Sequence, residues 1–315
     1  MTSVEGSGDL PNLIMVGPGK SGTTSLFWYL SQHPDVCAAD VKELKYFAPI
    51  THGDGRLGPV EDYASHFGRC GDQRYRLEAS PQYFHGGEAI IDAIRRIVGE
   101  PKIVVTLREP VDRLWSIYRS LKVRTTIPAS MTIEDYVARC EEVRAKAEPL
   151  TLDNRAFWTL SGERYAAHLR PWLDAFGDDA RVVFFEDMVR EPASATRAIA
   201  GWLGIDEACV DAFSFTVENR TVANRSGALH RLALAANRSG LLGERRRVKG
   251  PLRKLYYGVN SAPQAERLPQ DVRLRLHAVF APDNAELADE LRQRGYAGLP
   301  PWLEEPPSPG APTTP

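Results

Sequence analysis

A strand, a glycine-rich turn and a helix are predicted near the start of the chain, and this pattern restricts the possible folds most. Leu13–Val16 are all apolar, as is typical of a central parallel strand covered on both faces. The following residues, Gly17-Pro-Gly-Lys-Ser-Gly-Thr-Thr-Ser25, combine three glycines with a lysine and four hydroxyl side chains. A helix that begins at such a turn exposes backbone N–H groups and the positive end of its dipole. The stretch therefore predicts a binding site for a phosphate-like anion.

The predicted turn differs from the loop of P-loop kinases and NTPases. That loop has a glycine, four residues and then Gly-Lys-Ser/Thr. Here Gly19-Lys20-Ser21 matches its end, but Ile14 occupies the place of the first glycine. The order Lys-Ser-Gly-Thr-Thr-Ser instead resembles the 5′-phosphosulfate loop of sulfotransferases, which use 3′-phosphoadenosine 5′-phosphosulfate (PAPS) as sulfuryl donor. The resemblance implies nucleotide binding by the whole run, Lys20, Ser21, Gly22, Thr23, Thr24 and Ser25.

A second strand-to-helix junction follows about 90 residues later. The apolar run Ile103–Leu107 leads directly into Arg108-Glu-Pro-Val-Asp-Arg113-Leu-Trp-Ser116. This spacing resembles the 3′-phosphate motif of sulfotransferases, and it implies that Arg108 and Ser116 hold that phosphate while Arg113 supports the structure. In an alternative interpretation, Arg108 only pairs with Glu109 or Asp112. One nucleotide with phosphates at both its 5′ and 3′ ends explains both junctions.

The order of elements predicts an α/β fold with a central parallel sheet flanked by helices, the P-loop-like fold of sulfotransferases. We expect one sulfotransferase domain over residues 1–299 and a disordered, proline-rich tail over 300–315. Helices are predicted over 164–176 and 193–203, and a buried strand over 181–187. A further helical region over 271–294 is expected to be interrupted at Pro282.

Transfer to a hydroxyl needs a group that accepts the proton of that hydroxyl. By resemblance to glycosaminoglycan sulfotransferases, Glu43 in Lys42-Glu-Leu-Lys-Tyr-Phe47 is the candidate base, and Lys45 would orient sulfuryl oxygens. The alternative is an exposed glutamate paired with Lys42 or Lys45. His85 is a second candidate base, although a lone histidine is more often structural.

One departure from the glycosaminoglycan enzymes weakens a heparan-like acceptor. Several of those enzymes carry a lysine just before the Ser/Thr-Pro turn, where this chain has Ala79.

Two later segments carry positive charge. Arg220 and Arg225 lie where family members close a loop over the nucleotide, and the sequence does not choose between them. The basic run 245–254 fits a lid over PAPS, a dock for an acidic partner or a solvated surface.

Composition bounds the remaining expectations. The net charge of −2 gives no overall attraction to nucleic acid or to an anionic membrane. Four widely spaced cysteines without a CxxC pair argue against a disulfide framework or a zinc site, and for a reducing cytosol. The first twelve residues lack the features of a signal peptide, and no stretch is apolar enough to span a membrane, so we expect a cytoplasmic location.

These patterns together predict a PAPS-dependent sulfotransferase. It would move a sulfuryl group by in-line transfer to a hydroxyl of a small-molecule, natural-product or carbohydrate acceptor, release 3′-phosphoadenosine 5′-phosphate (PAP) and need no metal. The alternatives are a P-loop kinase, which would require a carboxylate to hold Mg²⁺, and a nucleotide-binding protein without catalysis. The sequence does not predict the oligomeric state.

Overall fold

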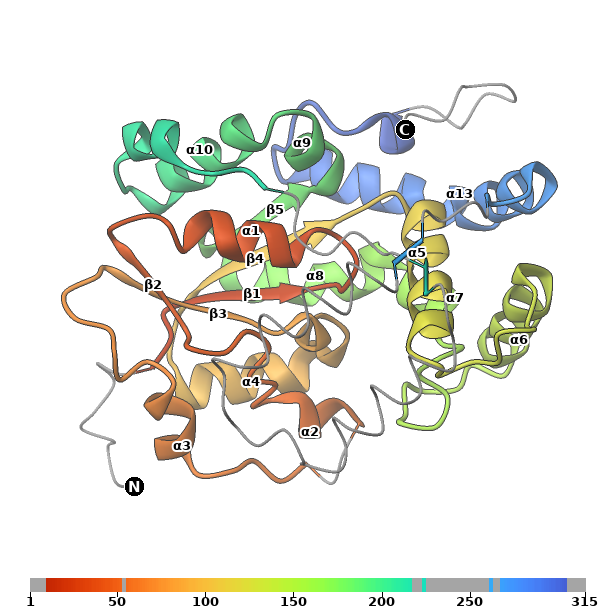
Figure 1. The fold of residues 1–315 in the computed structure, drawn as a ribbon, viewed down its shortest axis with the longest axis horizontal. Helices are drawn as coiled ribbons and strands as arrows, with labels where there is room; N and C mark the ends of the chain where they lie inside the picture. Colours follow the sequence, from red (N-terminus) through yellow and green to blue (C-terminus); the bar gives the residue numbers. More distant parts are fainter. Residues whose placement is uncertain (1–9, 53–54, 217–222, 225–260, 263–266, 305–315) are drawn as a thin grey trace.

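Five parallel strands form the centre of the molecule, in the order β2-β3-β1-β4-β5 (Figure 1). The computed structural model describes residues 10–52, 55–216, 223–224, 261–262 and 267–304. The strands are β1 (Leu13–Gly17), β2 (Val36–Ala38), β3 (Tyr75–Ala79), β4 (Lys102–Leu107) and β5 (Ala180–Phe184). This arrangement confirms the predicted α/β class with a parallel sheet.

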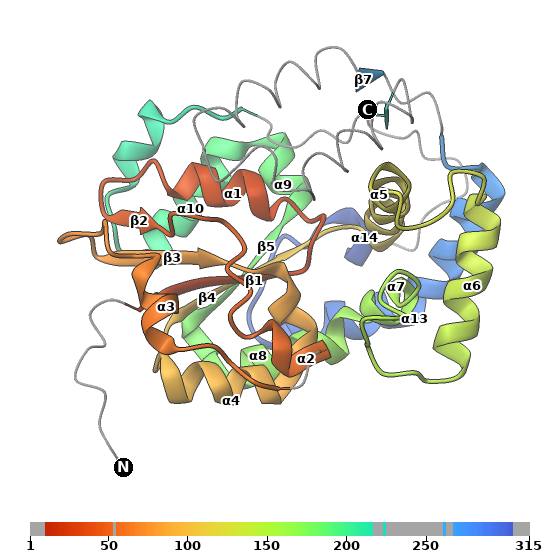
Figure 2. The same ribbon diagram turned by 60° about the horizontal axis from the view of Figure 1, so that its bottom comes forward.

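Helices cover both faces of the sheet, because successive side chains of a strand point to opposite sides. In β1, Leu13 and Met15 belong to the apolar core that includes α1 (Thr23–Leu30) and α10 (Pro192–Leu203). Ile14 and Val16 belong to the core on the other face, with α4 (Gly87–Ile97) and α8 (Tyr165–Phe176). Figure 2 shows the two helical layers on either side of the sheet. The uninterrupted apolar run in β1 is thus explained by burial on both faces.

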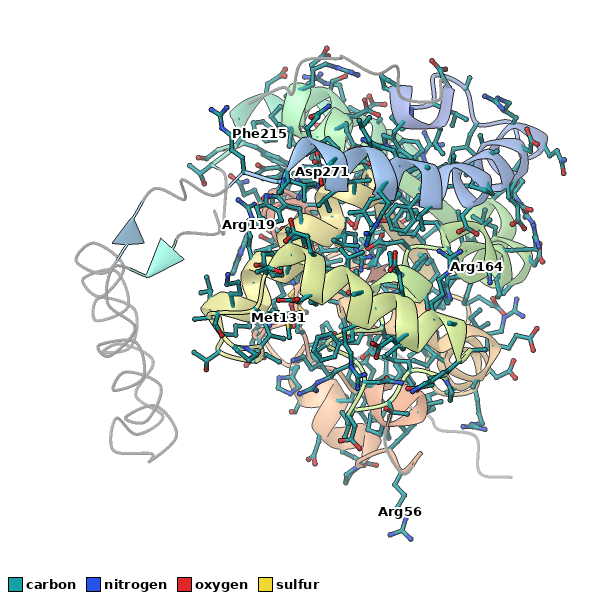
Figure 3. All side chains as sticks on the ribbon, turned by 90° about the vertical axis from the view of Figure 1, so that its right-hand side faces the viewer. Arg56, Arg119, Met131, Arg164, Phe215 and Asp271 are labelled. Carbon is teal, nitrogen blue, oxygen red and sulfur yellow. A yellow bond between two sulfur atoms is a disulfide. The ribbon has the colours of Figure 1, made fainter. Side chains whose placement is uncertain are left out.

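A separate apolar core lies beyond the carboxyl end of β4. It joins α5 (Pro110–Val123), α6 (Ile133–Ala145) and the first half of α13 (Gln270–Gln293). Figure 3 looks onto this side of the molecule and labels Arg119 on α5 and Asp271 near the start of α13. The packing fixes α5, and therefore the residues at its start, relative to the sheet.

The remaining elements are short. They are α2 (Ala48–His52), α3 (Val60–Ser65), η2 (Pro81–Gly86), α7 (Thr159–Gly162), η3 (Gly177–Asp179), α9 (Phe185–Arg190), η4 (Glu207–Ala212), the antiparallel pair β6 (Ala223–Asn224) and β7 (Ser261–Ala262), and α14 (Pro301–Glu304).

Three predicted boundaries differ from the structure. The strand expected to reach residue 187 ends at Phe184, where α9 begins. Helix α13 continues through Pro282; the proline removes one backbone donor, but Phe280 and Leu287 are buried on either side of it. The disordered tail was expected to begin at residue 300, but the structure continues with α14, in which Leu303 is buried. In α13 tertiary packing outweighs the local preference of proline, whereas α14 begins at Pro301, a position that proline favours.

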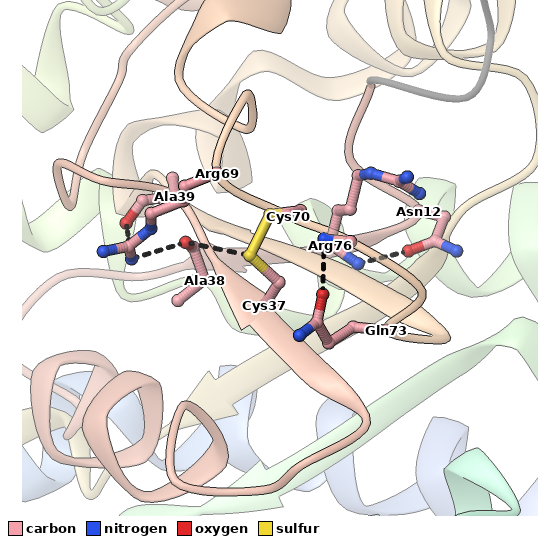
Figure 4. Close-up of a disulfide and its surroundings, with 9 residues drawn as sticks. Asn12, Cys37, Ala38, Ala39, Arg69, Cys70, Gln73 and Arg76 are labelled. Carbon is pink, nitrogen blue, oxygen red and sulfur yellow. Dashed lines mark hydrogen bonds between the residues drawn. A yellow bond between two sulfur atoms is a disulfide. The ribbon is translucent and has the colours of Figure 1, made fainter.

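A disulfide joins Cys37 in β2 to Cys70, with 5.7 Å between the two Cα atoms (Figure 4). The expectation of no disulfide was therefore wrong. The neighbouring Arg69 donates a hydrogen bond to the carbonyl oxygen of Ala38 at 2.8 Å, which holds the returning chain against the edge strand. This pairing depends on how the chain returns after α3, so the spacing of the cysteines gave no sign of it. The disulfide also removes the argument that cysteine usage made for a reducing compartment.

Candidate functional site

The two predicted anion-binding junctions meet at one edge of the sheet. Strands β1 and β4 are neighbours, so their carboxyl ends and the turns that follow lie side by side. Nη1 of Arg108 donates to the carbonyl oxygen of Lys20 at 3.3 Å, and Nε of Arg113 donates to that of Gly19 at 2.7 Å. Ligands of open α/β sheets bind at this edge. The geometry brings Lys20 and Arg108 within reach of a single ligand.

Glycine is required at two positions of the first turn. Gly17 has φ +106°, and a Cβ there would lie 2.5 Å from the backbone of Pro81. Gly22 has φ +82°, and a Cβ there would lie 2.6 Å from Cε of Met188. Both positions therefore combine a left-handed backbone with a close neighbour, and only glycine meets both conditions. The turn is held between the chain after β3 and the residues that follow β5.

Positive charge gathers around the turn. The pKa of Lys20 is lowered to about 8, first by burial and then by the positive charges of Arg124, Arg108 and Arg119. The guanidinium of Arg108 lies over the ring of Phe185, 4.3 Å from its centroid. A bound anion would relieve the repulsion among these cations.

The alternative interpretation of Arg108 is not what the structure shows, since no carboxylate in the described residues forms an ion pair with it. Glu109 instead caps α5 by accepting hydrogen bonds from the backbone N–H groups of Val111 and Asp112, at 2.9 and 2.6 Å. Asp112 pairs with Arg273 of α13 at 2.8 Å. Both acidic neighbours of Arg108 therefore have other partners.

Several buried polar groups at this edge fit an anionic ligand. Oγ of Ser21 and Nε of Arg108 are buried without a hydrogen-bond partner. Such groups are costly unless something accepts their protons. Thr23 and Ser116 are also buried, whereas Thr24 and Ser25 are partly exposed. These are the residues that the sequence assigned to the two phosphate groups.

Arg113 supports the turn from inside the molecule. It is buried, and its Nη1 forms an ion pair with the buried carboxylate of Glu163. Oη of Tyr165 donates to the carbonyl oxygen of Arg108 at 2.9 Å. Sequence reasoning found Arg113 but missed Glu163, because an isolated glutamate before a helix carries no signal of a buried partner.

The candidate base lies in the connection between β2 and α2. The carboxylate of Glu43 is 3.1 Å from Nζ of Lys42 and 3.6 Å from Nζ of Lys45, and it accepts a hydrogen bond from Nε2 of Gln82 at 3.3 Å. Burial alone would raise the pKa of Glu43, but Lys42, Gln82 and Lys45 outweigh burial and hold that pKa below its ordinary value. Glu43 is thus an ionised, partly exposed carboxylate, and the predicted lysine pairing is present. Gln82 was not predicted.

Glu43 and Lys45 have left-handed rather than extended backbones. Their φ angles are +65° and +60°. The other candidate base, His85, packs among aromatic rings, with its centroid 5.3 Å from Trp158 and 4.8 Å from His168.

The remaining expectations concern residues outside the described ranges, metal binding and membrane-spanning helices. Arg220, Arg225, the run 245–254 and the tail after residue 304 are not described. Over the described ranges, no group of three or more His, Cys, Asp or Glu side chains is placed to hold a metal ion. None of the helices in those ranges has both the length and the apolar character needed to cross a membrane.

An open parallel sheet with a glycine-rich, cationic turn at its carboxyl edge is typical of α/β proteins that bind phosphate groups. Comparison with known proteins identifies the family: the sulfotransferase domain profile matches residues 10–227, and the chain belongs to this family.

Relatives with established names agree with this family. The chain is 27% identical over 305 residues to the bifunctional heparan sulfate N-deacetylase/N-sulfotransferase 1 of Caenorhabditis briggsae, covering 94% of this chain and 32% of that protein. It is 29% identical over 211 residues to the heparan sulfate glucosamine 3-O-sulfotransferase 3A1 of Mus musculus, covering 66% of this chain and 49% of that protein. The chain thus spans about a third of the length of the first relative and about half of the length of the second.

A solved structure supports the fold. The sulfotransferase from Alicyclobacillus acidocaldarius superposes with a TM-score of 0.62 at 24% identity, covering 90% of this chain and 96% of that one.

Proposed function

We propose that the chain is a PAPS-dependent sulfotransferase that transfers a sulfuryl group to a hydroxyl of a carbohydrate or small-molecule acceptor. The observation that carries this proposal is the contact between the two junctions, where Arg108 reaches the backbone of Lys20. It supports the binding of one nucleotide by both of its phosphate groups. Buried, unpartnered donors at Ser21 and Arg108 fit the oxygens of such a ligand.

The side chains around the turn have separate roles in this proposal. Ser21, Gly22, Thr23, Thr24 and Ser25 bind the 5′-phosphosulfate, and Arg108 and Ser116 bind the 3′-phosphate, with PAP as product. Lys20 also binds the 5′-phosphosulfate. It stabilises the negative charge that develops on the oxygen bridging phosphate and sulfate as the S–O bond breaks. Arg220 and Arg225 remain candidates for closing a loop over the nucleotide.

Glu43 is the proposed base, and it takes the proton from the acceptor oxygen that attacks sulfur. Lys45 is close enough to Glu43 to orient the sulfuryl oxygens beside it. Since Lys42 and Lys45 hold the carboxylate in its ionised form, Glu43 is ready to accept a proton at neutral pH.

The acceptor class follows from the relatives only in outline. Their names include both N- and O-sulfotransferases of heparan sulfate. We therefore include an amine among the acceptors to be tested, next to hydroxyls of saccharides and small molecules. The absence of a metal requirement and a cytoplasmic location remain predictions.

Isothermal titration with adenosine 3′,5′-bisphosphate and with ATP–Mg²⁺ tests the nucleotide. We expect binding of the bisphosphate, and a loss of at least about tenfold in affinity for Arg108→Ala, the usual effect of removing a charge-assisted hydrogen bond. Binding of ATP–Mg²⁺ in place of the bisphosphate would favour the kinase alternative.

Transfer itself is measured with ³⁵S-labelled PAPS and a panel of hydroxyl- and amine-bearing saccharides and small phenols. Labelled product that disappears in Lys20→Ala supports an enzyme. Tight bisphosphate binding without transfer to any member of the panel, and without release of sulfate from PAPS, would favour a nucleotide-binding protein that lacks catalysis.

A further inference from the structure

A fully buried carboxylate lies directly beneath the segment that carries Glu43 and Lys45. Glu78 of β3 has no exposed surface. Its Oε2 accepts a hydrogen bond from Oη of Tyr63 at 2.7 Å, and its Oε1 accepts from Oη of Tyr83 at 3.0 Å and from Oγ of Ser80. No lysine or arginine in the described part of the chain forms an ion pair with it. Glu78 is therefore held by three hydroxyl groups, which we call the Glu78 network.

Two of these hydroxyls also hold the backbone of residues 43–47. Oγ of Ser80 accepts a hydrogen bond from the N–H of Lys45 at 2.9 Å, and Oη of Tyr83 accepts from the N–H of Phe47 at 3.3 Å. The N–H of Glu43 donates to the carbonyl oxygen of Ala79, next to Glu78, at 3.0 Å. The backbone N–H groups of every second residue from 43 to 47 thus donate hydrogen bonds to residues 79–83, the stretch that directly follows Glu78.

The segment needs such support because its backbone is unusual. Glu43 and Lys45 both adopt left-handed φ angles, which are unfavourable for residues with a Cβ. Conformations of this kind persist only where surrounding contacts determine them, and they gather at functional sites. The bonds from Lys45 and Phe47 to the two hydroxyls provide these contacts.

The acceptor oxygens of Glu78 and the backbone donors of the segment together set the direction of these bonds. An ionised carboxylate only accepts hydrogen bonds, so the hydroxyl protons of Ser80 and Tyr83 point toward it. Their lone pairs are then left for the N–H groups of Lys45 and Phe47. Burial raises the pKa of Glu78 above its ordinary value, and the hydrogen bonds from Ser80, Tyr63 and Tyr83 offset only part of that rise. The direction of the bonds is therefore set by the geometry: the N–H groups of Lys45 and Phe47 donate to the two hydroxyl oxygens, so the hydroxyl protons are left for Glu78.

We propose that Glu78 is a positioning residue, which acts through Ser80 and Tyr83 to fix the backbone of residues 43–47 and so directs Glu43 and Lys45 toward the acceptor. The inference rests on the proposed role of Glu43 in transfer. It adds a residue that contacts no reacting atom but determines where the base lies.

Residues 80–81, which follow β3, also contact the proposed nucleotide-binding turn. The N–H of Ser80 donates to the carbonyl oxygen of Met15 at 3.1 Å, and the backbone of Pro81 fills the space beside Gly17. These contacts to the nucleotide-binding turn are made by the backbone of residues 80–81 and not by the hydroxyls of the Glu78 network, so substitutions of those hydroxyls leave them in place.

Tyr63 provides a matched control for the experiment. Tyr63→Phe and Tyr83→Phe each remove one hydroxyl from the same buried carboxylate and keep the ring. Of the two tyrosine hydroxyls, that of Tyr83 accepts a bond from residues 43–47, whereas among the described residues that of Tyr63 hydrogen-bonds only Glu78. The ring of Tyr63, which stacks on Tyr46, is kept in Tyr63→Phe. Glu78→Gln keeps the shape but introduces an amide donor, which competes with the hydroxyl protons and disturbs both bonds to the segment.

Hydrogen–deuterium exchange of the peptide that contains residues 43–47 measures the effect without any acceptor. We expect exchange about tenfold faster or more in Tyr83→Phe and Glu78→Gln, and within about twofold of the original protein in Tyr63→Phe, because the loss of one buried hydrogen bond changes local opening by about tenfold. Thermal unfolding should shift similarly in both tyrosine variants. Equal exchange of this peptide in all variants, or equal acceleration by both tyrosine substitutions, would overturn the proposal.

Two further measurements separate positioning from general damage. Affinity for adenosine 3′,5′-bisphosphate should stay within about threefold in all three variants, because none of them removes a group from the phosphate-binding turns. The rate of sulfate release or transfer from PAPS should fall at least about tenfold in Tyr83→Phe but not in Tyr63→Phe, since misplacing a catalytic group is costly. A failure of the proposed transfer would leave the exchange result intact, so the two outcomes are distinguishable.

Discussion

At the scale of single residues, the surroundings of Lys20 and Glu43 shift the pKa of each side chain. Lys20 is buried among arginines, so burial first and then like charges lower its pKa, whereas Glu43 lies between lysines whose opposite charges lower its pKa despite burial. Both shifts have consequences that depend on pH.

The affinity for adenosine 3′,5′-bisphosphate should fall as the pH rises through about 8, the pKa of Lys20 in the ligand-free protein. Below this pH the lysine is already charged; above it the ligand must bind together with a proton, so affinity should fall by up to about tenfold per pH unit. Titrations in buffers of different ionisation enthalpy measure the proton uptake. Lys20→Arg, which stays charged, should remove most of this dependence; an equally steep profile in that variant would argue against Lys20 as its source.

Glu43→Gln should lower turnover of PAPS by at least about 100-fold, the usual contribution of a general base, and leave bisphosphate affinity nearly unchanged. Because the pKa of Glu43 is held below its ordinary value of 4.5, the carboxylate should stay ionised and active in mildly acidic solution. Turnover should fall only at a pH below 4.5, where Glu43 becomes protonated. Steady-state kinetics from about pH 3 to pH 8 check both points. If Glu43→Gln keeps normal turnover, His85 becomes the next candidate base.

At the scale of elements, the strand-to-helix turn after β1 is shaped by its neighbours on both sides. Gly17 lies against Pro81, and Gly22 lies against Met188 and Phe185. Gly19, in the same turn, has open surroundings, with its nearest neighbour, Cβ of Pro81, 3.7 Å from where its own Cβ would be. The three glycines are therefore not equivalent.

Gly22→Ala should reduce the free energy of unfolding by more than about 1 kcal/mol, because the new methyl group meets a side chain in a left-handed backbone. It should also weaken bisphosphate binding, since Gly22 precedes the first turn of α1. Gly19→Ala serves as the control, and its unfolding free energy should change by less than half as much. Denaturant unfolding followed by tryptophan fluorescence makes the comparison, and similar losses in both variants would contradict it.

The sequence was sufficient for the elements that carry strong local signals. The apolar runs of β1 and β4, together with Gly17–Ser25 and the run from Arg108 to Ser116, predicted the sheet class and the two junctions. The structure added what those runs do not encode: Glu163 beneath Arg113, Gln82 beside Glu43, and the hydroxyls around Glu78. Each of these depends on a partner far away in the chain. A glutamate within the otherwise apolar end of β3 was the one visible sign of the buried carboxylate.

At the scale of the whole molecule, the Cys37–Cys70 disulfide ties the edge strand β2 to the chain that returns from α3. The loop that it closes contains Glu43 and Lys45. It therefore limits the conformations of the acceptor-side segment in the unfolded chain.

Loss of this bond in Cys37→Ser should reduce the free energy of unfolding by up to about 3.7 kcal/mol, the chain-entropy value for a loop closed over 33 residues. Guanidinium unfolding with and without dithiothreitol measures the effect. Dithiothreitol should destabilise the original protein and leave Cys37→Ser unchanged. Cys209→Ser, which removes a free thiol, should respond like the original protein. No response of the original protein to the reductant would show that the bond does not form in solution.

The contact of Pro81 with Gly17 has a consequence for anyone who redesigns this protein. Because the proposed nucleotide-binding turn and the chain after β3, which supports the proposed acceptor side, meet at this contact, substitutions of either residue should disturb both half-sites together.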